Sequence, residues 1–326
     1  MKKKIKFLIA LLVFLMIVFS FFFMGKAPVQ DEIVWGMNFS QKHTQALNLD
    51  WKETYLALLD DLNIKNVRLI AYWDMVEPQK DQYFFEDLDW QIEEAKKRNA
   101  DVILTVGMKT PRWPECHIPE WARDNWEEEL LKYLEEIVEQ HKDEEIVWAW
   151  QIENEPFFPF GDCPETSRDL VEKEIDLVKK LDPDKKIVIT ESGSFSFWFK
   201  GAKLGDVVGI SLYQEAWFKE LKRYVKYHLP GVFYWRKSKI IDFVFEKEII
   251  CTELQAEPWG PTLLYDSSLE EQKKTMNLDR FRDIISLAKE TGLKEFYFWG
   301  GEWWYWMKTK QNDDSIWEET KELINN

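Results

Sequence analysis

Short apolar runs and longer amphipathic stretches alternate along most of the chain. The short runs are rich in β-branched and aromatic residues and are bounded by polar residues, the pattern of buried β-strands. We predict strands at residues 33–38, 66–71, 101–107, 146–152, 186–190, 206–212, 248–253 and 294–300. The nearly continuous apolar character of each run indicates a parallel sheet that is covered on both faces.

Between these runs, apolar positions recur every three or four residues, which is the period of an amphipathic helix. Residues 126–141 carry Trp126, Leu130, Leu134 and Val138 on one such face. The stretch 268–291 has the same period, and Gly292 follows it where a glycine favours the end of a helix. We predict a helix over each stretch.

Eight strands with intervening helices and a uniform composition predict a single closed (β/α)8 barrel over residues 31–326. The alternative, a doubly wound sheet, should open with a glycine-rich turn between strand and helix, which this chain lacks. Only residues 195–204 are available for a helix between the fifth and sixth strands. Residues 213–247 form an insertion whose second half is predicted to be helical, whereas 220–230 carry no clear pattern.

The first thirty residues have a different character from the rest of the chain. Lysines crowd the first six positions, and residues 7–24 are apolar except for Ser20. Such a run is near the minimum that spans a bilayer as a helix, and the preceding lysines favour a cytoplasmic N-terminus. A cleaved signal peptide is the alternative, although the run is long for one and residues 21–27 offer a poor cleavage site. We therefore predict a membrane anchor at residues 1–30, with the barrel outside the cytoplasm.

Composition excludes several classes of partner. A net charge of −16 opposes nucleic-acid binding and suits a neutral substrate such as a polysaccharide. The four histidines, His43, His117, His141 and His228, show no metal-ligand spacing, so we predict neither a metal nor an organic cofactor. Nothing in the sequence indicates a protein partner.

The chain has three cysteines, too few for a disulfide framework. Cys251 lies inside an apolar strand and is predicted to be a small core residue. Cys116 and Cys163 fall in loops that would be neighbours in a barrel. Outside the membrane they could form a disulfide, and two free thiols remain the alternative.

The candidate chemistry lies at strand ends. Asn154, Glu155 and Pro156 follow the fourth predicted strand, and Glu253 ends the seventh. Active sites of such barrels are built where the strands end, so these two distant carboxyls should meet at the barrel mouth. Retaining glycosidases use such a pair, one carboxylate to attack the sugar and one carboxylic acid to donate a proton.

On these motifs, residues 31–325 resemble clan A of the glycoside hydrolases, the retaining (β/α)8-barrel enzymes that include cellulases, mannanases and β-galactosidases. The resemblance implies that Glu155 is the acid/base and that Asn154 contacts the sugar 2-hydroxyl. It also implies that Glu253 is the nucleophile. The residues around Glu155 are similar to β-galactosidase motifs, which favours a β-galactoside as substrate. Cleavage of β-glucan or mannan is an equal alternative.

Three further residues match supporting positions of the clan. Arg68 on the second strand and Tyr213 after the sixth resemble the groups that hydrogen-bond the nucleophile, and Trp299 resembles the aromatic floor beneath the attacked sugar. Two departures are visible. Residues 108–110 lack the histidine that many members place after the third strand, and residues 190–193 have no role that we can assign.

Two other glutamates compete for the catalytic roles. Glu153 directly precedes Asn154 and is predicted to point into the barrel wall or to pair structurally. Glu257 lies beyond the seventh strand and is predicted to line the rim of the pocket, where it supports substrate binding.

The chain has eighteen tryptophans, far above ordinary usage. Flat aromatic faces suit the C–H faces of pyranose rings. For the tryptophans that follow strand ends we therefore predict sugar contact: Trp73, Trp113, Trp121, Trp217, Trp259, Trp299, Trp303, Trp304 and Trp306. For those on predicted helices we expect core packing: Trp51, Trp90, Trp126 and Trp317.

Together these features predict a membrane-anchored retaining β-glycosidase that acts on β-linked oligo- or polysaccharide by double displacement. A barrel that binds glycan at the cell surface without cleaving it is the alternative from a different class. Such a binder has no need of the paired carboxyls. A transglycosylase would use the same residues and differ only in its acceptor.

Overall fold

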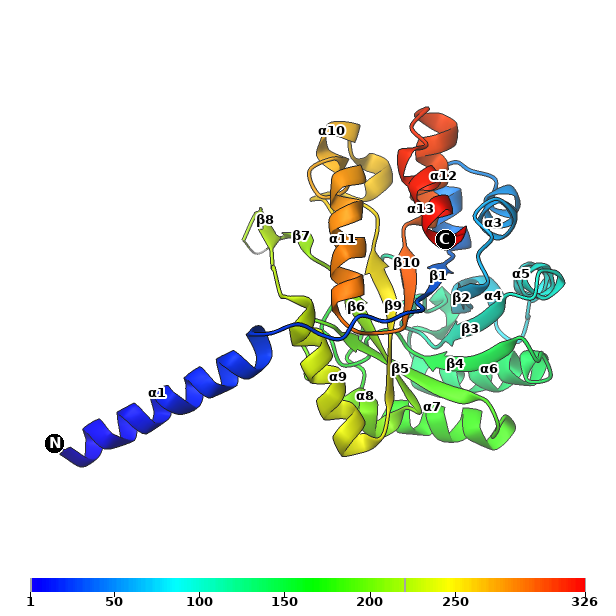
Figure 1. The fold of residues 1–326 in the computed structure, drawn as a ribbon. Coiled ribbons are helices and arrows are strands. Elements are labelled where there is room, and N and C mark those ends of the chain that lie inside the picture. The colour runs from blue at the N-terminus through cyan, green and yellow to red at the C-terminus, as the bar shows by residue number, and fades with distance from the viewer. Residues whose placement is uncertain (1, 220, 326) are drawn as a thin grey trace.

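The computed structural model describes residues 2–219 and 221–325 and forms a closed barrel of eight parallel strands (Figure 1). Around the barrel the strand order is β1-β10-β9-β6-β5-β4-β3-β2. The strands are β1 (Val34–Asn38), β2 (Asn66–Ile70), β3 (Asp101–Val106), β4 (Val147–Ile152), β5 (Lys186–Ser192), β6 (Val207–Leu212), β9 (Glu248–Gln255) and β10 (Glu295–Trp299). Each predicted strand is present within two residues at either end, so the barrel prediction is confirmed.

Helices surround this barrel on the outside (Figure 1). They are α2 (Gln41–Ala46), α3 (Trp51–Asp60), α4 (Trp73–Val76), α5 (Glu86–Lys97), α6 (Trp126–His141), α7 (Arg168–Leu181), α8 (Phe199–Leu204), α9 (Gly231–Phe245), α10 (Leu269–Gln272), α11 (Leu278–Glu290), α12 (Gly301–Lys310) and α13 (Ser315–Asn325). The helix predicted at residues 126–141 is confirmed as α6. The stretch 195–204 forms only the short helix α8.

The single helix predicted over residues 268–291 is wrong, because the chain breaks it into α10 and α11. Asn277 is extended, at φ −160°, and its side chain accepts a hydrogen bond from the backbone N–H of Arg280. An asparagine in this position caps a new helix instead of continuing an old one. Gly292 follows α11 at φ +66°, as expected for a glycine beyond a helix end.

The insertion between β6 and β9 begins with a hairpin and ends in a helix. Strands β7 (Glu215–Phe218) and β8 (Arg223–Lys226) pair in antiparallel fashion, and α9 follows them. The helical second half of the insertion is therefore confirmed. Strand β8 of the hairpin lies in residues 220–230, for which no structure was predicted.

The barrel interior is filled by a compact apolar layer contributed by six strands: Ile103, Ala149, Val188, Val207, Ile250 and Tyr297. Tyr297 is fully buried, and its ring needs the space left by Gly36. A Cβ added at Gly36 would come within 2.7 Å of that ring. The outward faces of the strands pack against the helices in a separate, larger cluster. The polar groups described next lie at the carboxyl ends of the strands.

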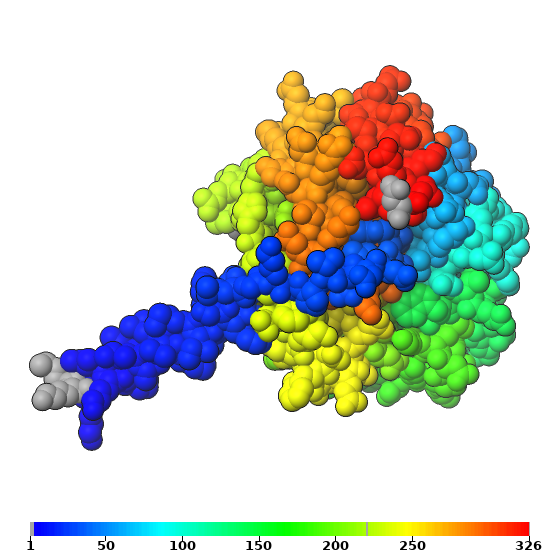
Figure 2. Space-filling view, in the orientation of Figure 1, coloured from blue at the N-terminus to red at the C-terminus, as the bar shows by residue number. Residues whose placement is uncertain are grey.

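Helix α1 (Lys2–Phe23) projects away from the barrel (Figures 1 and 2). Residues Lys3–Phe23 have a mean hydropathy of 2.8, and the helix is long and apolar enough to cross a membrane. At its end, Phe22 and Phe23 contact the ring of Phe233 on α9. A signal sequence near the N-terminus can also reach this length and hydropathy, so these features fit either an anchor or a signal.

Candidate active site

Arg68 lies at the centre of a polar network inside the barrel mouth. Its side chain is fully buried on β2 and donates to Glu253 at 2.9 Å, to Asn154 at 2.9 Å and to Gln151 at 2.7 Å. It also donates to Asn38 at 2.8 Å. A buried guanidinium is costly unless it is paired and hydrogen-bonded, and these partners satisfy it. The network thereby joins the ends of β1, β2, β4 and β9.

The two carboxylate oxygens of Glu253 have separate donors. Arg68 donates to Oε1, and the Tyr213 hydroxyl donates to Oε2 at 3.0 Å. A positive charge and a hydroxyl that both donate to one carboxylate favour its ionised form. They also fix the plane in which that carboxylate lies.

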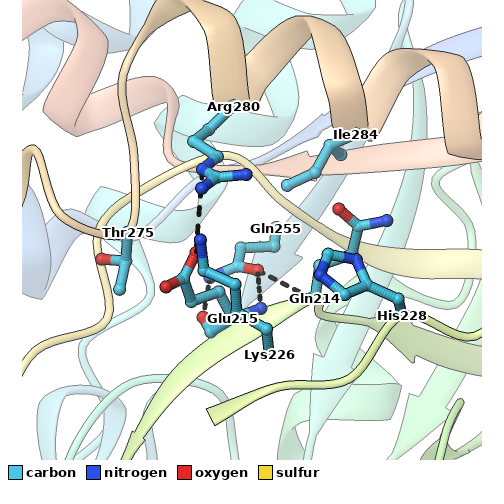
Figure 3. A pocket seen from close by; sticks show the side chains of 8 residues that line it. All are labelled: Gln214, Glu215, Lys226, His228, Gln255, Thr275, Arg280 and Ile284. Carbon is cyan, nitrogen blue, oxygen red and sulfur yellow. Dashed lines mark hydrogen bonds and ion pairs between the residues drawn. The ribbon is translucent and has the colours of Figure 1, made fainter. Parts of the chain in front are cut away.

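The chain directly after Tyr213 is held by Gln255, two residues beyond Glu253. The Gln255 side-chain oxygen accepts the backbone N–H groups of Gln214 and Glu215 at 2.9 and 3.2 Å. Its amide nitrogen donates back to the Glu215 carbonyl at 2.6 Å. Figure 3 shows this arrangement around a small cavity beside the β7–β8 hairpin, where Arg280 approaches Glu215. Gln255 thus fixes the segment that places the Tyr213 hydroxyl on Glu253.

Glu155 follows β4 and has a different environment. Its carboxyl is half-buried and accepts one hydrogen bond from the Ser211 hydroxyl at 2.6 Å. Burial, followed by the negative charge of Glu253, raises the pKa of Glu155 to about 7. The influence of Glu253 places the two carboxyls in one electrostatic site. A carboxyl with this pKa keeps its proton to a higher pH than an ordinary glutamate does.

The backbone at the end of β4 is unusual, because Glu153 and Glu155 both have left-handed conformations, at φ +57° and +44°. The buried Glu153 carboxylate accepts the backbone N–H groups of Met108 and Lys109 at 2.9 and 2.5 Å. Glu153 therefore has the structural role that was predicted for it. Gly107 makes this contact possible, since a Cβ there would lie 2.5 Å from the Glu153 carboxylate.

Glu115 is a third carboxyl in this site, and the sequence analysis missed it. It is buried in the loop after β3 and accepts a hydrogen bond from the Asn154 amide at 3.1 Å. Burial, followed by the charge of Glu253, raises the pKa of Glu115 to about 8. The neighbouring Cys116 forms a disulfide with Cys163, which decides between the two possibilities left open for these cysteines. Within residues 2–219 and 221–325, no cluster of His, Cys, Asp and Glu suits a metal ion.

Comparisons with known proteins identify the family of this chain. The family model described as Cellulase (glycosyl hydrolase family 5) matches residues 30–228. The chain belongs to glycosyl hydrolase family 5. It is therefore a glycoside hydrolase of the retaining clan A, and the resemblance found in its sequence is confirmed. No curated protein matches the chain.

Solved structures share the fold of this family 5 chain at low sequence identity. GH5_18 from Bifidobacterium longum, in complex with Manb1-4GlcNAc, has a TM-score of 0.58 at 13% identity, covering 82% of this chain and 69% of that one. Xylanase 10B from Thermotoga petrophila, in complex with xylobiose, has a TM-score of 0.52 at 15% sequence identity. The match covers 85% of this chain and 86% of the xylanase. The β-galactosidase from Halorubrum lacusprofundi has a TM-score of 0.53 at 15% sequence identity. The match covers 81% of this chain and 52% of the β-galactosidase, so this chain spans about half the length of that protein.

Several tryptophans of this family 5 barrel do not have the predicted place. Trp73 is fully buried, stacks on Tyr133 at 5.5 Å and donates its ring N–H to Glu77, so the prediction that it contacts sugar is wrong. Trp303 and Trp304 are also buried, because α12 turns them into the layer between barrel and helices. Residues just after a strand end are often exposed, which is why sugar contact was predicted for both. The packing of α12 buries them instead.

Trp259 and Trp113 keep exposed surface near the mouth. Trp259 packs edge-on against Tyr213 at 5.2 Å and lies 5.5 Å from Phe160. Trp113 is 55% exposed and contacts the same Phe160. The aromatic surface beside Glu253 is therefore built by Trp259, and sugar contact there stays a prediction.

Glu257, which was predicted to line the pocket rim, has less exposed surface than a rim position implies. It is buried and pairs with Arg112, which comes from the loop after β3. The Arg112 guanidinium also lies 3.9 Å from the centre of the Trp299 ring, a cation–π contact that covers one face of the indole. Trp299 keeps little exposed surface. No sequence motif indicated Arg112, because Glu257 and Trp299 are more than a hundred positions away in the sequence.

Proposed function

We propose that this enzyme hydrolyses β-linked glycosides by double displacement, with Glu253 as nucleophile and Glu155 as acid/base. The observation that carries the proposal is the division of one electrostatic site between two carboxyls. Glu253 receives hydrogen bonds from Arg68 and Tyr213, whereas Glu155 is half-buried with a pKa raised to about 7. An ionised carboxylate and a protonated carboxyl are what the first step requires.

In the first step, a Glu253 oxygen forms a bond to the anomeric carbon while the bond to the leaving oxygen breaks. The proton of Glu155 passes to that oxygen, and a glycosyl ester remains on Glu253. Forming the ester removes the negative charge of Glu253. Since that charge contributes to the raised pKa of Glu155, the pKa then falls and Glu155 becomes a base.

In the second step, Glu155 takes a proton from water as the water oxygen attacks the anomeric carbon. The ester bond breaks, Glu253 leaves as a carboxylate, and both groups return to their starting states. We propose that Asn154, fixed by Arg68 and Glu115, contacts the sugar 2-hydroxyl during both steps. Trp299 and Trp259 would supply the aromatic surface for the sugar.

The substrate class follows from charge and from the solved structures of similar fold. A net charge of −16 favours a neutral sugar. The similar structures are described with Manb1-4GlcNAc, with xylobiose or as β-galactosidases. We therefore propose a neutral, β-linked oligo- or polysaccharide as substrate.

We also propose that residues 1–30 anchor the enzyme in a membrane and that the barrel of residues 31–326 works outside the cytoplasm. The apolar helix α1 and the lysines at its start support this arrangement. Cleavage of the same segment as a signal would release a secreted barrel.

The test uses a panel of aryl β-glycosides and β-linked oligosaccharides. We expect Glu253→Gln to lower turnover at least about a thousandfold, the scale of losing a principal catalytic group. Glu127→Gln, the same change at an exposed position on α6, is the matched control and should be unaffected. Release of sugar by Glu253→Gln at the unchanged rate would reject the nucleophile assignment.

A further inference from the structure

A second charged cluster lies beside the two carboxyls, and the mechanism above does not use it. Arg112 pairs with Glu257 and, at 3.0 Å, with Glu302, and it stacks on Trp299. His43, from α2 after β1, completes the cluster. The four charged or polar side chains are each more than nine-tenths buried.

Three polar atoms of this cluster have no hydrogen-bond partner within residues 2–219 and 221–325. They are His43 Nε2, Arg112 Nε and Glu257 Oε2. His43 Nε2 and Glu257 Oε2 are 3.6 Å apart, too far for a good hydrogen bond. Buried polar atoms are almost always paired in folded proteins, so three unpaired ones in one cluster point to a ligand that pairs them.

The cluster adjoins the proposed nucleophile. Burial raises the pKa of Tyr213, and the charges of Glu253, Glu257 and Arg112 also act on its hydroxyl. Because the Tyr213 hydroxyl donates to Glu253, a sugar placed on Glu253 lies within reach of this cluster.

Sheet topology decides which part of the substrate reaches it. The proton donor Glu155 must lie beside the leaving oxygen, so the leaving group lies on the side of β4. In the barrel order, β10 is opposite β4, with β9 and β1 on either side of β10. The end of the attacked sugar that is remote from the cleaved bond therefore points toward Trp299, Glu257 and His43, which follow these three strands.

We propose that Arg112, Glu257 and His43 bind the hydroxyl groups of a terminal sugar and close the site behind it. The enzyme then removes single neutral sugars from the non-reducing end of its substrate. This inference rests on the proposed function. Glu257 Oε2 accepts from one hydroxyl, Arg112 Nε donates to a hydroxyl oxygen, and His43 Nε2 pairs with a neighbouring hydroxyl.

The charges of the cluster select a neutral sugar. Burial, followed by the charge of Arg112, lowers the pKa of His43 well below its usual range, so the ring is neutral. Arg112 already pairs with two carboxyls, Glu257 and Glu302. Its positive charge is therefore compensated and does not favour binding of an acidic sugar.

Arg112 and Trp299 close the site on the side that is remote from the cleaved bond. An enzyme that cleaves within a chain needs space for further sugars on this side, and the buried Arg112 and Trp299 occupy it. The loop that carries Arg112 is held in place, because the Arg112 carbonyl accepts from Glu115 N and lies 3.1 Å from the His117 ring. The disulfide of Cys116 fixes the same loop.

The first experiment uses the unmodified enzyme on the sugar that the aryl glycoside panel identifies. A tetrasaccharide labelled at its reducing end should yield the labelled trisaccharide first, with the monosaccharide as the only other product. The same tetrasaccharide methylated on O4 of its non-reducing sugar should resist cleavage. Labelled disaccharide as an early product, or cleavage of the methylated chain, would overturn the inference while leaving the proposed function intact. No turnover on any substrate would overturn both.

The second experiment assigns the hydroxyl contacts. Aryl monoglycosides that lack one hydroxyl at C3, C4 or C6 are compared in the unmodified enzyme and in Glu257→Gln. We expect the unmodified enzyme to lose at least about tenfold in kcat/KM on the analogue that lacks the contacted hydroxyl. Glu257→Gln should discriminate much less between that analogue and the parent, because the two changes remove the same contact. Glu127→Gln serves as the control and should discriminate like the unmodified enzyme. Equal discrimination by Glu257→Gln and the unmodified enzyme on every analogue would reject the contact.

Discussion

At the scale of single residues, the environment of each carboxyl separates two chemically identical groups. Glu253 has a guanidinium and a phenol as donors, whereas Glu155 has one serine hydroxyl and a neighbouring negative charge. The first environment favours a carboxylate and the second a carboxylic acid. The proposed roles of the two glutamates therefore differ because their hydrogen-bond partners differ, although the side chains are identical.

This difference predicts the pH dependence of the enzyme. In the proposed mechanism the protonated form of Glu155 is the active one, and the pKa of this carboxyl is raised to about 7. We therefore expect kcat/KM to fall as pH rises through about 7, approaching tenfold per pH unit. A pH–rate profile on an aryl glycoside with a poor leaving group measures this.

A control is needed because Glu115 also titrates in the site, with a pKa raised to about 8. Glu115→Gln should keep an alkaline limb, whereas Glu155→Ala should lose it and retain more activity on good leaving groups, which need no proton. An alkaline limb that survives in Glu155→Ala and vanishes in Glu115→Gln would transfer the proton-donor role to Glu115.

At the scale of elements, the end of β4 stores backbone strain where the proposed proton donor is placed. Two glutamates adopt left-handed conformations, and the carboxylate of Glu153 is bound to the backbone after Gly107. Non-glycine residues in such conformations persist only when the surrounding contacts hold them. The contact between the β3 and β4 ends therefore sets the direction of Glu155.

A single methyl group at Gly107 should test this contact. Gly107 has φ +121°, and the new Cβ would lie 2.5 Å from Glu153. We expect Gly107→Ala to lower the free energy of unfolding by about 1–3 kcal/mol and to reduce kcat. Urea unfolding and aryl glycoside kinetics measure the two effects.

Gly260→Ala is the matched control, since nothing lies closer than 3.6 Å to its added Cβ. This control should change stability little. Unchanged stability and activity in Gly107→Ala would show that Glu153 does not fix the end of β4.

At the scale of the whole molecule, the chain joins an apolar N-terminal helix to an acidic barrel. Helix α1 projects away from the barrel (Figure 2), and the phenylalanines at its end, Phe22 and Phe23, contact Phe233 of α9. The barrel carries its own core and site. We therefore propose that the helix determines where the enzyme is located and takes no part in its chemistry.

The proposed membrane anchor predicts how the full chain behaves in a cell membrane fraction. We expect the enzyme to remain with the membranes after an alkaline wash and to retain residues 1–30, because about twenty apolar residues suffice to span the bilayer. Membrane fractionation followed by N-terminal sequencing measures both. A soluble enzyme whose sequence begins within residues 21–30 would instead identify a cleaved signal.

The sequence by itself determined the barrel and the two proposed catalytic glutamates. Strand character is local, since each strand is a short apolar run, and the carboxyl ends of parallel strands must meet at one mouth. Glu155 and Glu253 could therefore be placed together although 98 positions separate them in the sequence. The resemblance to clan A implied that Arg68 and Tyr213 hydrogen-bond Glu253, and both do so in the structure.

Only the tertiary structure decided what the loops and the packing contribute. Arg112 and Glu302 are 190 positions apart and lie beyond strands, where no periodic pattern constrains direction. Burial of Trp73 depends on how α4 packs, and the partner of Glu115 is an amide on another strand. Residues in loops take their neighbours from long-range packing, and local sequence does not encode that packing. The proposed catalytic glutamates could thus be found from strand ends, whereas the cluster that we propose to select the sugar required the folded molecule.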